Sequence, residues 1–182
     1  MLRLLIIYLN RKFNTIIEKG SSVKKVCLSI ISLLLWYVPV AFVQMISARV
    51  TIASINPWYN SLIKASWTPP AWVFGPAWTI LYILMTISVW VVYRTQIASQ
   101  SHRMAYPLFF LQLVANGLWS FLFFGFHMIG WALVDLTLLI VLIVCTTICF
   151  YRIKPVAGLL LIPYLLWCLY ALTLNAAIWW LN

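Results

Sequence analysis

The sequence predicts an all-α membrane protein, a bundle of five transmembrane helices, and three observations support this fold class. Of the 182 residues, 65% are hydrophobic and 8% are charged, whereas a soluble domain carries roughly 25% charged residues. Five stretches reach the about 20 mostly apolar residues that a spanning helix requires. These stretches are apolar throughout and about twice as long as a transmembrane β-strand. A helical bundle is therefore expected, not a barrel.

The first 25 residues differ from the rest of the chain and are assigned to a basic N-terminal extension, residues 1–25. Apolar residues recur there at helical spacing, with lysines and arginines between them. This pattern predicts a short amphipathic helix that lies in the lipid headgroup region. An organelle-targeting peptide, which is also basic and poor in acids, is the alternative interpretation.

The five spans are expected within residues 26–182, which we assign to one domain. Their ranges are residues 26–48, 72–93, 105–126, 128–151 and 156–181. The connection between the first two spans is a long loop, residues 49–71, and a tight turn near His127 joins the third span to the fourth. The spans use nearly the whole region, so the sequence indicates one compact bundle in the lipid bilayer without a separate soluble domain.

The basic residues are divided unevenly between the two ends of this bundle. All twelve Lys and Arg except Arg49 and Lys64 fall on the side of the N-terminus. By the positive-inside rule, this distribution predicts an N-in, C-out orientation in a bacterial cell membrane. The net charge of +10 therefore reports topology and not nucleic-acid binding, because no groove-reading motif accompanies it.

Polar and aromatic residues gather on the faces of several spans. Gln112, Asn116 and Ser120 share one face of the third span, and the fifth span carries Tyr164, Trp167, Ala171 and Asn175 at helical spacing. Interhelical hydrogen bonds are one explanation of the polar groups, and an interfacial belt is one explanation of the tryptophans. Because Trp78, Trp119 and Trp167 lie deeper than a belt and on the polar faces, we expect a pocket in the outer half of the bundle.

The stretch SWTPPAWVFGPAW, residues 66–78, places three tryptophans around two adjacent prolines. Pro69 and Pro70 stand just before the second span, where their fixed φ is compatible with the start of a helix. We expect a stiff corner that holds Trp67, Trp72 and Trp78 in place. Rigid aromatic walls bind flat apolar ligands with little loss of conformational entropy.

Four blocks of the sequence are long and distinctive: NPWYNSLIKASWTPPAWVFGPAWTILYILM, LQLVANGLWSFLFFG, MIGWALVDL and IPYLLWCLYALTLN. They resemble the TspO/translocator protein family, also called the peripheral benzodiazepine receptor or tryptophan-rich sensory protein family. The resemblance covers residues 56–182 and the first span. It implies a five-helix membrane protein, often a homodimer, with a ligand cavity beneath the first loop. It also implies protoporphyrin IX or haem as the ligand, with no cofactor required.

The resemblance also implies which residues bind the ligand. Matched residue by residue, the family's pocket positions fall on Tyr59, Pro69, Trp78, Asn116, Trp119, Trp167 and Ala171, and Trp67 of the first loop is added as a further wall residue. Trp78 and Trp167 are expected to stack on the macrocycle, and Asn116 to bond to polar substituents. Asp135 matches the family's lone acid in the fourth span. We expect it to be a proton-relay acid or to bond to donors of the loop or a neighbouring helix.

The leading hypothesis for the function is tetrapyrrole binding by a sensory or regulatory membrane protein. The alternatives are transport of porphyrins or other hydrophobic molecules and light-dependent porphyrin degradation. The sequence offers neither a conventional catalytic set nor a metal site, since no His or acid accompanies Cys145 and Cys149. Sterol handling is less favoured, because Ala176 and Trp180 replace the tyrosine and the basic residue of the proposed cholesterol motif. In a eukaryote, the mitochondrial outer membrane or the secretory pathway would be expected.

Overall fold

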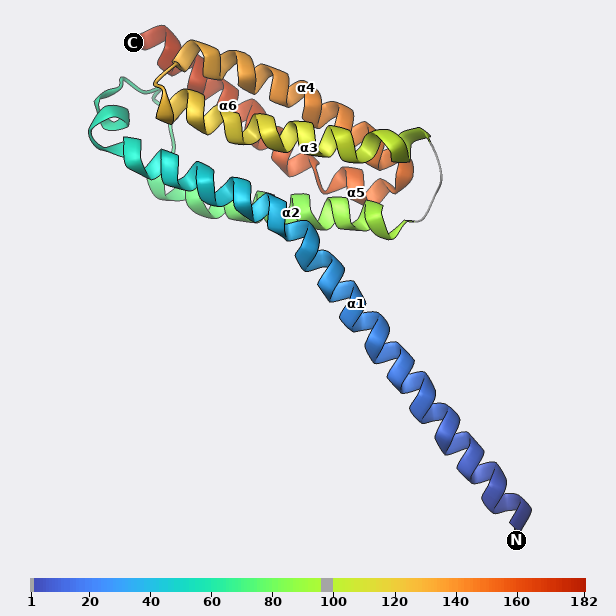
Figure 1. Cartoon of the computed structure of the whole chain (residues 1–182). Helices are drawn as coiled ribbons and strands as arrows, with labels where there is room; N and C mark the ends of the chain where they lie inside the picture. The colour runs from blue at the N-terminus through green and yellow to red at the C-terminus, as the bar shows by residue number, and fades with distance from the viewer. Residues whose placement is uncertain (1, 96–99) are drawn as a thin grey trace. The chain divides into compact units, whose positions relative to one another are not determined.

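The structure, a computed structural model, describes the backbone of residues 2–95 and 100–182 and the side chains of residues 24–95 and 103–182. Its helices are α1 (Leu2–Ser54), α2 (Phe74–Arg94), α3 (Gln100–Ser120), α4 (Ile129–Ile153), α5 (Pro155–Leu159) and α6 (Ile162–Leu181) (Figure 1). The chain divides into two compact units, Met1–Leu35 and Trp36–Asn182. The backbone of the first unit is helical, and the predicted amphipathic face of residues 1–25 falls mostly outside the described side chains.

Within the described residues, five helical segments are long and apolar enough to cross a membrane, which confirms the predicted fold class. They are Lys24–Tyr59, Ala71–Arg94, Arg103–Gly125, Ile129–Ile153 and Pro155–Leu181. In the second unit α4 packs most extensively against α3, and α2 contacts α3, α4, α5 and α6. The part of α1 within this unit packs closely against α3, because a Cβ added at Gly117 would lie 3.2 Å from Val43.

The first helix ends later than the sequence predicts. The loop was expected to begin at residue 49, but α1 continues to Ser54 and is followed by a π-helical turn, η1 (Ile55–Tyr59). Residues 49–55 contain neither Gly nor Pro, so nothing in them stops the helix. The break occurs at Asn56, whose backbone is extended at φ −116° and ψ 129°. Asn56 directly precedes Pro57, and a proline disfavours the helical conformation in the residue before it.

The fifth span consists of two helices instead of one. Helix α5 ends at Leu159 and α6 begins at Ile162, with a turn closed by a 3.0 Å hydrogen bond from the Leu161 N–H to the Gly158 carbonyl. Pro163 stands in the first turn of α6. Because proline has no N–H to donate to the carbonyl four residues earlier, a continuous helix would lose a bond at this point.

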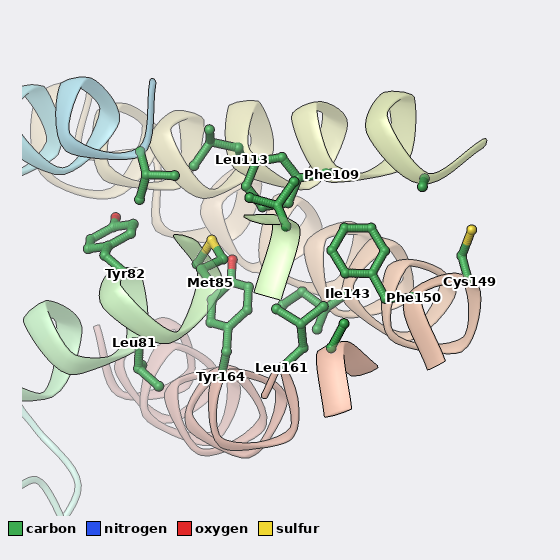
Figure 2. Close-up of a cluster of buried hydrophobic side chains, with 14 of the residues drawn as sticks. Leu81, Tyr82, Met85, Phe109, Leu113, Ile143, Cys149, Phe150, Leu161 and Tyr164 are labelled. Atoms are coloured by element: carbon green, nitrogen blue, oxygen red, sulfur yellow. The ribbon is translucent and has the colours of Figure 1, made fainter. Parts of the chain in front are cut away.

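A hydrophobic core surrounds Phe109, which is fully buried and stacks on Phe150 with the ring centroids 6.2 Å apart (Figure 2). Three further residues are at most 1% exposed: Met85 of α2, Ile143 of α4 and Leu161 between α5 and α6. Close packing extends to Gly158, where an added Cβ would lie 2.6 Å from the Cβ of Tyr151. The buried core cluster takes residues from α2, α3, α4, α5 and α6 and also Val40 from α1.

Candidate ligand-binding cavity

A cavity of about 450 Å³ lies within the second unit. Its size falls within the roughly 300–1,000 Å³ of small-molecule and cofactor sites. The lining comes from five helices and from η1 and the π-helical turn η3 (Phe121–Gly125) at the end of α3. Most of the lining side chains are aliphatic or aromatic, among them Ile55, Phe74, Phe123, Leu139, Leu174 and Ile178.

Three indole rings are among the aromatic residues of the lining. Trp78 comes from α2, Trp119 from α3 and Trp167 from α6. Trp119 stacks on Phe123 at 5.1 Å between ring centroids, and Trp167 meets Phe74 edge-on at 5.9 Å. These aromatic contacts fix the ring planes, so the cavity presents preformed flat surfaces.

Hydrogen bonds between helices hold this aromatic lining in position. The Trp119 Nε1–H donates to the Asn175 Oδ1 at 3.0 Å, and the Asn175 Nδ2 donates to the Ile129 carbonyl at 3.1 Å. One amide thus joins α3, α6 and the start of α4. A buried amide needs partners for both its donor and its acceptor. The side chain of Asn175 has both, so it serves to hold the three helices together.

The side chain of Asn116, a residue predicted to bind the ligand, is likewise hydrogen-bonded to other helices. Its Oδ1 accepts a 2.6 Å bond from the Tyr82 hydroxyl, and its Nδ2 donates to the Tyr164 hydroxyl at 3.1 Å. Asn116 is 3% exposed and still borders the cavity. Trp78 lies over the same pair of phenols, 5.5 Å from Tyr82 and 6.2 Å from Tyr164 between ring centroids. Figure 2 shows both tyrosines within the core cluster.

A polar face of α1 was missed by the sequence analysis. Gln44, Ser47 and Thr51 follow one another at steps of three and four and all line the cavity. The Gln44 Nε2 donates a long bond of 3.5 Å to the Thr79 Oγ1 across the gap to α2. The signal that could have identified them is their helical spacing within an otherwise apolar span.

The loop between α1 and α2 is fastened to α6. The Trp67 Nε1–H donates to the Thr173 Oγ1 at 3.4 Å, and the Tyr170 hydroxyl donates to the Trp67 carbonyl at 2.8 Å. The Asn182 amide bonds to both the N–H and the carbonyl of Ile63, each at 3.0 Å. The loop therefore lies at the end of the bundle where the chain reaches Asn182 (Figure 1).

The structure gathers six of the predicted ligand-binding residues around the cavity: Tyr59, Trp78, Asn116, Trp119, Trp167 and Ala171. Trp67 and Pro69 belong to the loop and are not among the lining residues; Trp67 is 55% exposed and bonded to α6. Asp135 lies outside the lining and is 6% exposed. Its Oδ2 has no hydrogen-bond partner in the described part of the chain, so that oxygen makes none of the expected bonds to loop or helix donors.

A charged side chain lies at the edge of the cavity and not in its lining. Among the described lining residues there is no Lys, Arg, His, Asp or Glu. The Lys64 ammonium lies 4.7 Å from the centre of the Tyr59 ring, and Tyr59 is a lining residue. The arrangement suits an aromatic or aliphatic molecule whose charged groups remain at the edge, because burying an unpaired charge in an apolar wall is costly.

Comparisons with known proteins agree on one group of relatives. The model of the TspO/MBR family matches residues 35–181. The chain is 40% identical over 124 residues to the human translocator protein, covering 67% of this chain and 73% of that protein. It is 42% identical over 132 residues to the tryptophan-rich protein TspO of Archaeoglobus fulgidus, covering 72% and 84%. It is 32% identical over 143 residues to the tryptophan-rich sensory protein of Cereibacter sphaeroides, covering 77% and 88%.

Proposed function

The chain belongs to the TspO/MBR family, and from this premise we propose that it binds a tetrapyrrole, protoporphyrin IX or haem, as a sensory or regulatory membrane protein. The ligand occupies the cavity beneath the first loop. Its flat macrocycle stacks on Trp78 and Trp167, and burial of its apolar faces supplies most of the affinity. No separate cofactor is required for binding.

The observation that carries this proposal is the set of three tryptophans around one uncharged cavity of about 450 Å³. Indole faces offer large and rigid contact areas with little entropy to lose on binding. The rings are already held by contacts with Phe74, Tyr82 and Phe123. A flat aromatic ligand can therefore enter without rearrangement of these walls.

The carboxylates of the porphyrin belong at the cavity edge in this proposal. The loop between α1 and α2 provides one cation near the lining, Lys64. Its ammonium lies over the ring of Tyr59. The orientation that follows from the positive-inside rule places this edge on the outer side of the membrane. Because the chain belongs to this family, we also propose that the protein forms homodimers.

The test is a titration of the purified full-length protein in detergent with protoporphyrin IX in the dark, followed by quenching of tryptophan fluorescence. Wild type is compared with the double variant Trp78→Phe/Trp167→Phe. The matched control is Trp131→Phe/Trp180→Phe, which removes the same number of indoles from positions 64% and 83% exposed. We expect saturable binding that weakens severalfold in the cavity variant and is unchanged in the control.

Equal affinity in all three proteins, or quenching that never saturates, would contradict the proposal. The same preparations separate the two alternative functions. A transporter, as the name of the human relative suggests for that protein, would move porphyrin across sealed vesicles that contain the protein. A degrading activity would yield a new absorbing product only under light, and the Trp78→Phe/Trp167→Phe variant would lose it.

A further inference from the structure

Some of the polar groups that line the cavity are hydrogen-bonded to other parts of the protein, and others are not. Tyr82, Asn116 and Asn175 are bonded to other parts of the bundle. Thr79 donates to the Gly75 carbonyl of its own helix at 2.9 Å. These groups have little hydrogen-bonding capacity left for a ligand, because their donors serve the fold.

The lining hydroxyls of Tyr59, Ser47, Thr51 and Ser120 make no such bond within the described residues, and the three small ones lie on α1 and α3. Ser47 and Ser120 are 7% and 6% exposed. The Ser47 Oγ has no partner in hydrogen-bond geometry, although it lies near the Tyr82 phenol, whose proton goes to Asn116. The side-chain hydroxyls of Thr51 and Ser120 make no hydrogen bond within the described residues.

Several threonines elsewhere in the spans are satisfied within their own helix, although the Thr147 Oγ1 of α4 also has no partner within the described residues. Thr86, Thr137 and Thr146 each donate to the carbonyl four residues earlier, at distances of 2.7 to 2.8 Å. Such back-bonding satisfies a hydroxyl within its own helix. The lining hydroxyls on α1 and α3 do not take this route, and leaving a buried hydroxyl unpaired is unfavourable.

We propose that Ser47, Thr51 and Ser120 form a recognition site for a neutral hydrogen-bonding substituent of the ligand, a hydroxyl, a carbonyl or an N–H. This inference rests on the proposed tetrapyrrole function and adds a selectivity to it. A hydroxyl both donates and accepts, so the site suits any of these neutral groups. A charged substituent is disfavoured, because no described lining residue carries a compensating charge.

The selectivity is tested with two porphyrins that differ in neutral hydroxyls alone. Haematoporphyrin IX carries hydroxyethyl groups where mesoporphyrin IX carries ethyl groups, and both have the same two propionates. Dissociation constants for both are measured in the dark for wild type and for Ser47→Ala/Thr51→Val/Ser120→Ala. We expect the variant to lose about tenfold in affinity for haematoporphyrin, the effect of one to two lost hydrogen bonds, and to retain its affinity for mesoporphyrin.

The control is Thr137→Val, which removes an exposed hydroxyl that donates to Leu133 at 2.8 Å and lies outside the cavity lining. It should change neither constant. Ser47→Ala and Ser120→Ala are measured singly as well, with folding checked by circular dichroism, so that the result does not depend on the triple variant. An unchanged ratio of the two constants would overturn the recognition site and leave the proposed function standing. Failure of wild type to bind either porphyrin would remove both proposals.

Discussion

The core around Phe109 and the cavity around Trp78 belong to the same bundle, yet their aromatic side chains pack in different ways. Phe109 is fully enclosed, with Phe150 stacked on it and Trp36 edge-on at 6.3 Å. Trp78 is only partly buried, and one side of it faces open space. In the core, side chains fill the space between helices; in the cavity, they only line it.

The cause of the difference lies in how closely the helices approach one another. Helices α3 and α4 make the most extensive contact in the bundle. Helix α1 approaches α3 and the turn η3 at two glycines, since a Cβ added at Gly117 would lie 3.2 Å from Val43 and one added at Gly125 would lie 3.3 Å from Val50. Between these contacts, the lining residues of α1, α2, α3, α4 and α6 leave the cavity open.

The largest expected effect tests the core side of this comparison. Phe109→Ala should lower the free energy of unfolding by about 3–5 kcal/mol, because it removes a fully buried ring and leaves a void. Denaturant unfolding in detergent, followed by circular dichroism, measures the loss. Affinity for protoporphyrin IX should change little at temperatures where the variant is folded. A loss below about 1 kcal/mol would show that the core is looser than its burial indicates.

A smaller effect is expected on the cavity side. Trp119→Phe keeps an aromatic ring but removes the donor to Asn175, which is 2% exposed. An acceptor left buried without its partner costs about 1–3 kcal/mol, so the loss of stability should be below that of Phe109→Ala. The same unfolding experiment measures it, with Trp131→Phe, a replacement at a 64% exposed indole, as the control. Equal stability of both variants would contradict a structural role for the Trp119 bond.

The smallest effect concerns the loop that covers the cavity. Asn182→Ala removes both side-chain bonds to Ile63 and should lower global stability by at most about 1 kcal/mol, since the bonds are exposed to solvent. Hydrogen exchange of the loop amides, residues 60–68, should become faster. Ser61→Ala is the control, because the Ser61 Oγ donates to the Trp58 carbonyl within the same segment and not to α6. Unchanged exchange in Asn182→Ala would show that Trp67 alone fastens the loop.

Sequence reasoning worked where helical periodicity determines the face of a residue. Trp78, Trp119 and Trp167 could be placed on the same side as neighbouring polar residues from their spacing alone. Ser47 and Thr51 were missed because two hydroxyls in a strongly apolar span change its hydropathy very little. The lack of a partner for the buried Ser47 Oγ cannot be read from the sequence, because it depends on the positions of the neighbouring helices.

The loop and the helix ends were harder to predict, for a different physical reason. Trp67 was expected in the cavity wall, but its position is set by bonds to residues more than a hundred positions away in the chain. No local pattern encodes such a contact. The break between α5 and α6 has a local cause in Pro163, but a proline near a helix start is compatible with either a kink or a new helix.

The polar face of α1 has a consequence for how this protein can diversify. Residues 44, 47 and 51 line the cavity and are not members of the buried core cluster that joins the helices. Substitutions at distant, independent sites tend to act additively. The lining of the cavity can therefore change through exchanges on one helical face while the core cluster is kept. A library of variants at these three positions should yield many stable proteins whose cavities differ in polarity.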